Sequence, residues 1–139
     1  MLALEVVPSP VTDVDRALAF YTEQAGFTLD VDYRPTANFR VVQLTPPGSA
    51  CSVQLVMADS TERVHNLHLV TGDIAAARAD LTARGVAVGG IRHKDSFQTW
   101  AGGWSAGPDP ERRDYASFAD FADPDGNTWT LQERGHLVS

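Results

Sequence analysis

Few residues of this sequence combine the chemistry and the setting of a catalytic group. His68 lies in a predicted strand, residues 65–71, and imidazole exchanges its proton near neutral pH. His68 is therefore the candidate general base or acid, and a half-buried structural histidine is the alternative. Cys51 lacks the sequence context of a nucleophile, and no glycine-rich phosphate loop with its lysine is found.

Aromatic residues gather in a glycine- and proline-rich segment, residues 92–114, which is too long for an ordinary connection. Trp100 and Trp104 lie in it, and Tyr115 and Phe118 follow it. Such rings form a wall for a planar ligand or pack in a dimer contact. We interpret the segment as a lid or a subunit contact. His93 lies near its start and is either a ligand contact or an ordinary surface histidine.

Arg40 is the one charge in a predicted apolar strand, residues 38–44. A charge on such a strand is costly unless it is paired. An internal carboxylate or the anionic group of a ligand would pair it, and the sequence leaves both interpretations open.

The elements that position these residues follow a repeated pattern. Asp13 and Asp73 each follow a short β-like run and precede a predicted helix, residues 14–25 and 74–84. At this position an aspartate accepts hydrogen bonds from the free N–H groups of the first turn. A glycine follows each helix as a carboxyl-terminal cap, and a new strand then begins.

The remaining strands complete a βαβββ order in each half of the chain. We predict them at residues 38–44, 51–57, 65–71, 86–91, 115–121 and 127–133. The sequence therefore predicts an α+β fold in one domain, residues 1–139. Its two repeats cover residues 2–58 and 63–134, and the second repeat contains residues 92–114 as an insertion.

A turn near the end of the chain adds a family resemblance. Asp-Pro-Asp-Gly-Asn, residues 123–127, opens a turn before an alternating strand. Together with the paired repeats and the helix opening Asp-Val-Asp-Arg-Ala-Leu-Ala-Phe-Tyr, residues 13–21, it resembles the vicinal oxygen chelate superfamily. That group includes glyoxalase I, bleomycin-resistance proteins and extradiol dioxygenases. The resemblance implies two curved half-barrel sheets, a divalent metal between them in the enzymes, and a homodimer.

The metal positions of that family do not carry suitable ligands here. The resemblance places them at Val6, Gln54, Asn66 and Thr130. Divalent metals prefer carboxylate, imidazole or thiolate, so only Gln54 is a credible ligand. We therefore expect no metal and no cofactor.

Strand alternation extends this set of positions to a polar, neutral concave face. It groups His68 with Asn66, Ser52 with Gln54, and Gln132 with Thr130. These side chains would orient a ligand, or would only fill the cup of the fold. The candidate ligand-binding residues are Arg40, Ser52, Gln54, Asn66, His93, Trp100, Trp104, Tyr115, Thr130 and Gln132.

Charge and hydropathy limit the partners. The chain has 11 basic and 18 acidic residues, a net charge of −7, and no apolar run close to the roughly 20 residues of a membrane span. We expect neither nucleic acid nor membrane as a partner, and an acidic protein weakly favours a cationic ligand. The amino terminus lacks the features of a signal peptide, so a cytoplasmic location is expected.

The sequence is consistent with two alternative functions that belong to different classes. The first is metal-independent binding of a small planar or aromatic organic molecule, as in bleomycin-resistance sequestration. The second is an enzyme, with metal-free proton transfer at His68 or with a glyoxalase- or dioxygenase-like metal held by displaced ligands. The fold alone does not decide between them.

Overall fold

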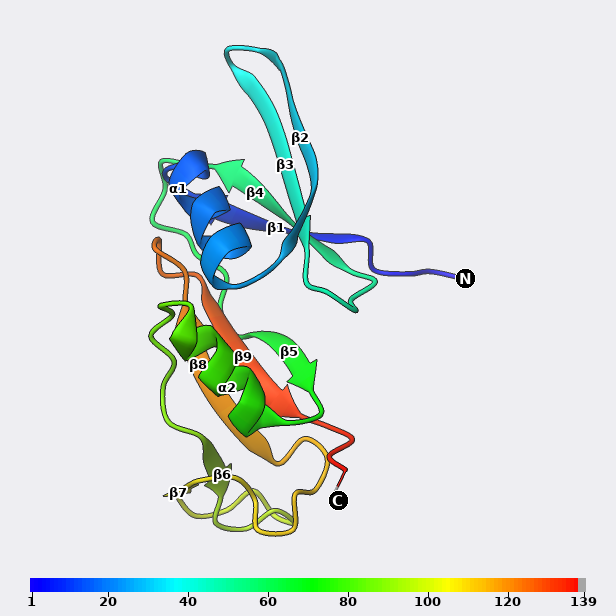
Figure 1. Ribbon diagram of the computed structural model, residues 1–139, viewed down its shortest axis with the longest axis vertical. Helices are drawn as coiled ribbons and strands as arrows, with labels where there is room; N and C mark the ends of the chain where they lie inside the picture. Colours follow the sequence, from blue (N-terminus) through cyan, green and yellow to red (C-terminus); the bar gives the residue numbers. More distant parts are fainter. Residues whose placement is uncertain (138–139) are drawn as a thin grey trace. The chain divides into compact units, whose positions relative to one another are not determined.

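The computed structural model describes residues 1–137, so the last two residues of the predicted domain lie outside it. These residues form two compact units (Figure 1). The first unit contains residues 1–64 and 123–127, and the second contains residues 65–122 and those from Thr128 onward. Each unit has one mixed sheet and helical segments, which confirms the predicted α+β class.

The first unit follows the predicted βαβββ order. Its elements are β1 (Val6–Val11), α1 (Val14–Ala19), the π-helix η1 (Phe20–Gln24), β2 (Thr28–Thr36), β3 (Phe39–Thr45) and β4 (Ser52–Met57). The strand order is β1-β4-β3-β2, with β1 parallel to β4 and the other pairs antiparallel. The predicted helix 14–25 is thus an α-helix that continues as one turn of π-helix.

Strand β1 is an edge strand that contains Pro8 and Pro10. The carbonyl of Val11 accepts a hydrogen bond from the N–H of Ala58 at 2.9 Å. In a parallel pair alternate residues direct their backbone groups to the partner strand, so those of Pro8 and Pro10 point away from β4. Both prolines therefore occupy positions where β4 needs no N–H donor from β1.

The turn at residues 123–127 is part of the first unit and is held by its own side chains. Asp123 Oδ1 accepts hydrogen bonds from the N–H groups of Asp125 and Asn127, at 2.9 and 3.0 Å. Its other oxygen, Oδ2, accepts from the Tyr21 hydroxyl at 2.8 Å. Asn127 Nδ2 donates to the outward carbonyl of Pro10, also at 2.8 Å. The motif behind the family resemblance thus fastens this turn to β1 and to the helical segment.

The second unit is built on a five-stranded sheet. Its elements are β5 (Leu67–Thr71), α2 (Ile74–Ala83), β6 (Arg92–Lys94), β7 (Trp104–Ala106), β8 (Ser117–Ala122) and β9 (Thr128–Glu133). The strand order is β5-β9-β8-β6-β7. Helix α2 packs on β8 and β9 and covers one face of the sheet (Figure 1).

One predicted strand is wrong. Residues 86–91 are irregular, and the strand begins only at Arg92. Gly89 and Gly90 lie in this stretch, and glycine weakens a strand because it has the most backbone freedom to lose. A backbone hydrogen bond from Gly89 N–H to the Asp120 carbonyl, at 2.8 Å, fixes the stretch beside β8. The predicted insertion 92–114 therefore begins with strands β6 and β7, which belong to the sheet.

The repeated helix caps form as the sequence predicts. The carboxylates of Asp13 and Asp73 each accept the N–H three residues further on at 3.0 Å. The glycines that end the two helical segments have φ of 79° at Gly26 and 93° at Gly85, values that other residues rarely adopt. Among the described residues, no helix has the length and hydrophobicity needed to cross a membrane.

A buried carboxylate ties α2 to the second sheet. Glu133 is fully buried, and its Oε2 accepts the N–H of Ile74, the first residue of α2, at 2.9 Å. Arg112 Nε donates to Glu133 Oε1 at 2.7 Å. Burial acts to raise the pKa of Glu133, but the hydrogen bonds from Arg112 and Ile74 outweigh it and the pKa is lowered.

We predict that Glu133→Gln destabilises the protein by about 2 kcal/mol at neutral pH, because Arg112 and the amino end of α2 lose their charged acceptor. The pKa of Glu133 is lower in the folded than in the unfolded state, so its contribution is present above the ordinary value of 4.5 and is lost as the pH falls through the folded value. Urea unfolding at neutral and acidic pH measures both effects. The wild type should lose more stability on acidification than the variant.

Glu111→Gln is the matched control. The Glu111 side chain is 71% exposed and contacts Arg113 at 3.3 Å, so its loss should change the free energy of unfolding by less than about 1 kcal/mol. Equal effects of the two substitutions would contradict the role given to Glu133.

Candidate functional site

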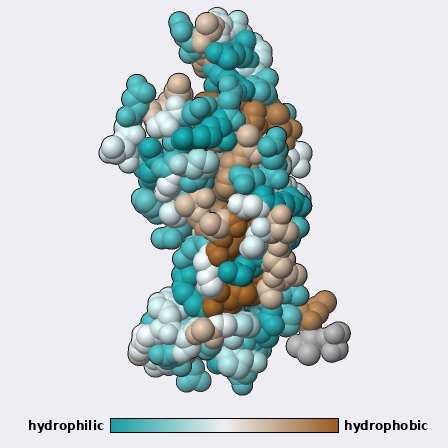
Figure 2. Space-filling model, turned by 60° about the vertical axis from the view of Figure 1, so that its left-hand side comes forward, coloured by the Kyte–Doolittle hydropathy of each residue, from teal (hydrophilic) through white to brown (hydrophobic). Residues whose placement is uncertain are grey.

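Large hydrophobic side chains remain exposed in both units. Figure 2 shows that such side chains interrupt a largely hydrophilic surface on the face that it draws. The exposed set includes Val31, Tyr33 and Phe39 in the first unit and Val70, Trp100, Trp104 and Tyr115 in the second. Several of them are aromatic, which makes both units places to look for a ligand surface.

Strand register separates the second sheet into two faces. Trp129 and Leu131 lie on the α2 side, where Trp129 stacks on Phe121 with 6.2 Å between ring centroids. The alternate residues of each strand lie on the opposite face. We call it the open face, and it comprises His68, Arg92, Lys94, Trp104, Phe118, Asp120, Thr130 and Gln132.

Four rings form a continuous aromatic cluster at the end of the open face near β6 and β7. Phe118 lies at its centre, with ring centroids 5.5 Å from Trp104 and 6.0 Å from Trp100. Phe97 extends the cluster, 6.0 Å from Trp100. Phe118 is buried, whereas Trp100 is 45% and Trp104 48% exposed. The cluster therefore presents two indole surfaces to solvent above a packed base.

Three cations border the aromatic cluster. The Arg92 guanidinium lies 4.7 Å from the Trp104 ring centroid, and the Lys94 ammonium lies 5.1 Å from the same centroid. Arg113 lies 4.7 Å from the Phe97 centroid. Each cation is attracted by the electron-rich face of its ring. Arg92 also pairs with Asp120 at 2.9 Å, so its charge is partly balanced.

Polar contacts fix the loop that carries Trp100. Lys94 Nζ donates to the Gly102 carbonyl at 2.7 Å, and Asp95 N–H donates to the Gly103 carbonyl at 3.0 Å. Trp100 has φ of 54°, a left-handed conformation that is unusual for a bulky residue, and its N–H bonds to the Ser96 carbonyl at 2.9 Å. The exposed indole is therefore held in place by its own loop.

A buried carboxylate supports the other side of this loop. Asp109 is buried and accepts hydrogen bonds from Arg113 Nε and Nη2, at 3.0 and 2.9 Å. These hydrogen bonds lower the pKa of Asp109 although burial opposes the shift. Because Arg113 also covers Phe97, the pair anchors the end of the aromatic cluster.

A polar row crosses the open face beside the cluster. Strand register places His68, Thr130 and Asp120 in line on adjacent strands. Thr130 Oγ1 donates to Asp120 Oδ1 at 2.9 Å, and His68 Nδ1 lies 2.6 Å from the carbonyl of Asn66. A carbonyl only accepts, so Nδ1 is the donor and Nε2 of a neutral His68 is left as an acceptor. Nε2 is thus the atom of the exposed imidazole that would accept a proton from a ligand.

Gln132 of the open face contacts a further predicted residue, Tyr115. Gln132 lies across from Phe118 and donates from Nε2 to the Tyr115 carbonyl at 3.2 Å. Tyr115 is 45% exposed, and its hydroxyl accepts from Arg134 at 3.3 Å. The second unit therefore brings together these predicted residues: Asn66, His68, Trp100, Trp104, Tyr115, Thr130 and Gln132.

Other predicted residues do not belong to the open face. His93 faces the opposite side of β6, and its Nδ1 donates to the Gly107 carbonyl at 2.8 Å. Arg40, in the first unit, is paired with Asp32 at 3.0 Å and with Asp15 at 2.7 Å. The pKa of Asp32 is lowered, chiefly by its hydrogen bond from Arg40. Arg40 thus has the internal carboxylate partners that the sequence left as one alternative.

The two remaining predicted residues belong to β4. Ser52 is buried, and its hydroxyl lies 2.6 Å from that of Thr45, so a ligand does not reach it without displacing this contact. Gln54 lines an open groove of about 310 Å³ together with Phe39, Val41 and Val56. Gln54 is therefore accessible, on a mainly apolar part of the first unit.

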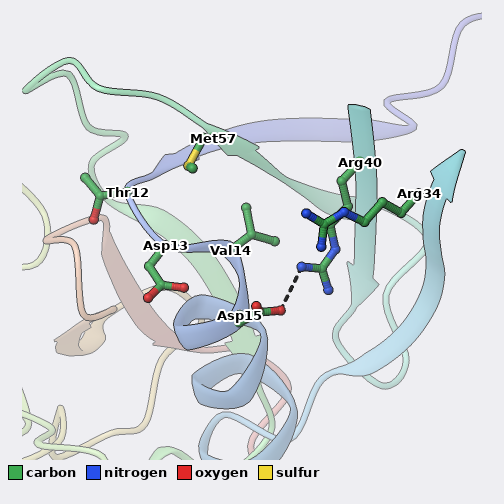
Figure 3. A pocket seen from close by; sticks show the side chains of 7 residues that line it. All are labelled: Thr12, Asp13, Val14, Asp15, Arg34, Arg40 and Met57. Atoms are coloured by element: carbon green, nitrogen blue, oxygen red, sulfur yellow. Dashed lines mark hydrogen bonds and ion pairs between the residues drawn. The ribbon is translucent and has the colours of Figure 1, made fainter. Parts of the chain in front are cut away.

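A second pocket of the first unit, of about 370 Å³, lies at the start of α1 (Figure 3). Its lining residues are Thr12, Asp13, Val14, Asp15, Arg34, Arg40 and Met57. Figure 3 shows the Arg34 and Arg40 side chains extending over Asp15 from the sheet. The paired Arg40 and the capping Asp13 are both engaged within the protein. This pocket is thus an ion-paired hollow without the stacked rings of the second unit.

Sequence reasoning missed Arg92, Lys94 and Asp120. A signal was present, because residues on either side of His93 share a strand face and both are cationic. The predicted strand ended at residue 91, so this pattern of two cations was overlooked. With residues 92–94 assigned to a loop, their alternation carried no meaning.

Comparison with known proteins agrees with this architecture. The family model described as the Glyoxalase/Bleomycin resistance protein/Dioxygenase superfamily matches residues 4–131. The chain belongs to this superfamily. No curated protein matches it.

Solved structures of the superfamily align over nearly the whole chain. TnmS3, an antibiotic binding protein from Streptomyces sp. CB03234, is 31% identical with a TM-score of 0.70, and the match covers 96% of each chain. A glyoxalase/bleomycin resistance protein from the same source is 32% identical, with a TM-score of 0.67 and coverage of 94% of this chain and 99% of that one. A superfamily member from Sphaerobacter thermophilus DSM 20745 is 26% identical, with a TM-score of 0.71 and coverage of 96% and 98%.

The donor groups at the superfamily's metal positions do not fit a divalent ion. In the second unit the Thr130 hydroxyl donates its proton to Asp120, and Asn66 Oδ1, 3.5 Å from Thr130 Oγ1, is only a neutral amide oxygen. In the first unit Val6 has no donor atom, and Gln54 supplies only a neutral amide. Among residues 1–137, no group of three or more His, Cys, Asp or Glu side chains is arranged to hold a metal.

We therefore predict that the protein purified without chelator contains far less than one equivalent of Mn, Fe, Co, Ni, Cu or Zn. Elemental analysis after dialysis measures this directly. Incubation with each metal should leave the thermal midpoint unchanged, because a site absent from the folded state gives no stabilisation by binding. A near-stoichiometric metal that survives dialysis would contradict the prediction.

Proposed function

We propose that this superfamily member binds a small planar organic molecule on the open face of its second unit, without a metal, and sequesters it. The observation that carries the proposal is the pair of half-exposed indoles, Trp100 and Trp104, packed on buried Phe118. Leaving such rings in water is unfavourable, and a planar ligand that stacks on them removes apolar surface from solvent.

Rigidity of the surface supports binding. Lys94 and Asp95 bond to the loop of Trp100, and the Asp109 and Arg113 pair anchors the end of the aromatic cluster at Phe97. A surface that is ordered before the ligand arrives loses little conformational freedom on binding. TnmS3, which is 31% identical, is an antibiotic binding protein, and this supports the binding of a small organic molecule by the present chain. The homodimer and the cytoplasmic location remain predictions.

A nitronaphthalene with a neutral hydroxymethyl group is a suitable probe, because its ring is planar and its nitro group quenches indole fluorescence. We predict saturable quenching of the wild type. Trp104→Ala and Trp100→Ala should each weaken binding roughly 10- to 100-fold, or about 1.4 to 2.7 kcal/mol, through lost stacking and burial. Titration followed by tryptophan emission, with calorimetry as a second readout, measures the affinity.

Tyr33→Ala is the matched control, since Tyr33 is an aromatic side chain of the first unit that is 57% exposed. It should bind the probe like the wild type. Absence of saturable binding in the wild type, or an equal loss in Tyr33→Ala, would overturn the proposed location.

His68 supports a second function, metal-free proton transfer. Its Nδ1 is fixed by the Asn66 carbonyl and its exposed ring lies in the polar row of the open face. A base in this position would act on a ligand stacked on the neighbouring rings. The proposal of binding does not require this activity.

The general-base probe 5-nitrobenzisoxazole, a planar molecule that opens when its ring C–H is deprotonated, tests this second function. If His68 is a base, the wild type accelerates ring opening and His68→Gln lowers kcat about 100-fold or more with KM nearly unchanged. His65→Gln, at an exposed histidine outside the strand, is the control. Equal rates for the wild type and His68→Gln would remove His68 from catalysis.

A further inference from the structure

Lys94 is the only lysine of the sequence, and it stands at the rim of the aromatic cluster. Its ammonium donates one hydrogen bond to the Gly102 carbonyl at 2.7 Å and lies 5.1 Å from the Trp104 centroid. An ammonium has three N–H donors, so two remain for another acceptor.

No carboxylate of residues 1–137 lies within ion-pair distance of Lys94. The nearby acidic side chains are engaged elsewhere, since Asp120 pairs with Arg92 and Asp95 accepts from the Ser105 hydroxyl. Arg92 adds a second cation on the same strand face, two residues before Lys94 and 4.7 Å from the same indole. Lys94 therefore offers a charged donor at the edge of the Trp104 ring, next to an Arg92 whose own charge is paired with Asp120.

We propose that Lys94, assisted by Arg92, forms a subsite for an anionic group carried by the planar ligand, such as a carboxylate, a sulfonate or an ionised phenol. The ring of the ligand lies against Trp100 and Trp104 while its anionic oxygens accept hydrogen bonds from the Lys94 ammonium. Hydrogen bonds of this kind, between charged partners, are roughly twice as strong as neutral ones. The proposal rests on the proposed function and names the chemical class of its ligand.

The net charge of −7 would favour the opposite choice, a cationic ligand. That preference is weak here, because at physiological salt exposed charges are screened beyond about 8 Å. A ligand stacked on Trp104 lies within that distance of Lys94 and Arg92. The Lys94 ammonium, which has no carboxylate partner among residues 1–137, therefore counts for more than the net charge of the chain.

Three nitronaphthalene probes that differ only in one substituent test the inference. The substituents are a carboxylate, a hydroxymethyl group and an aminomethyl group that is protonated at neutral pH. The wild type should bind the carboxylate roughly 5- to 10-fold more tightly than the alcohol, and the ammonium least tightly. Lys94→Met should reduce the ratio of carboxylate to alcohol affinity toward one, and any loss of loop order from the missing bond to Gly102 should weaken both affinities equally. Lys94→Arg, which keeps the charge, should retain most of the preference.

Because Lys94 also bonds to Gly102, a second measurement uses the unaltered protein. Reductive dimethylation followed by mass spectrometry modifies Lys94 and the terminal amine only, since the sequence has no other lysine. The carboxylate probe should slow modification of Lys94 and leave the terminal amine unaffected, whereas the alcohol probe at equal occupancy should protect less.

The outcomes separate the two proposals. Binding of the alcohol with no preference for the carboxylate, or with preference for the ammonium, overturns the anionic subsite and leaves the proposed function standing. An equal loss of both affinities in Lys94→Met, with no protection of Lys94 in the wild type, assigns the lysine to loop structure and also overturns it. Failure of all three probes to bind overturns the proposed function and the subsite with it.

Discussion

Alternate residues along β8 and β9 face different environments, and both the core and the candidate site of the second unit follow from this period of two. Phe121, Trp129 and Leu131 pack toward α2, whereas Phe118 and Thr130 lie on the open face. A shift of register by one residue would exchange the two sets and bury Asp120 in the hydrophobic core. The pairing of these strands therefore determines which side chains the open face presents.

Buried carboxylates hold the elements around this sheet. Glu133 joins Arg112 to the amino end of α2, and Asp109 joins Arg113 to the loop under Phe97. Each carboxylate is matched by an arginine, whose planar fork satisfies both of its oxygens. A buried charge without its partner is strongly unfavourable, so these pairs favour one arrangement of the segment that carries Arg112 and Arg113. Through the contact of Arg113 with Phe97, the second pair also reaches the end of the aromatic cluster.

The sequence was sufficient for the fold class, the repeated helix caps and the terminal turn, because each depends on local chemistry such as the Asp73 cap or the Asp123 turn. It failed at residues 86–94, where a glycine pair moved the strand forward by six residues and tertiary pairing with β8 outweighed local propensity. That error concealed Lys94 and Arg92. It also placed His93 in the candidate site, whereas the strand turns it to the opposite face. Arg40 pairs with Asp15 and Asp32, which belong to other elements, so the sequence around Arg40 does not identify them.

The prolines of β1 bear on how the first unit avoids self-association. An unpaired strand edge normally offers a row of N–H and C=O groups to which another chain adds, and this is a common route to aggregation. On the outer edge of β1 the N–H groups are missing at Pro8 and Pro10, and the Pro10 carbonyl is occupied by Asn127. At the other edge of the sheet, β2 contains Pro35 and the charges of Asp32 and Arg34. Both edges are therefore poor templates for strand addition, which protects a sheet that exposes Val31, Tyr33 and Phe39 to solvent.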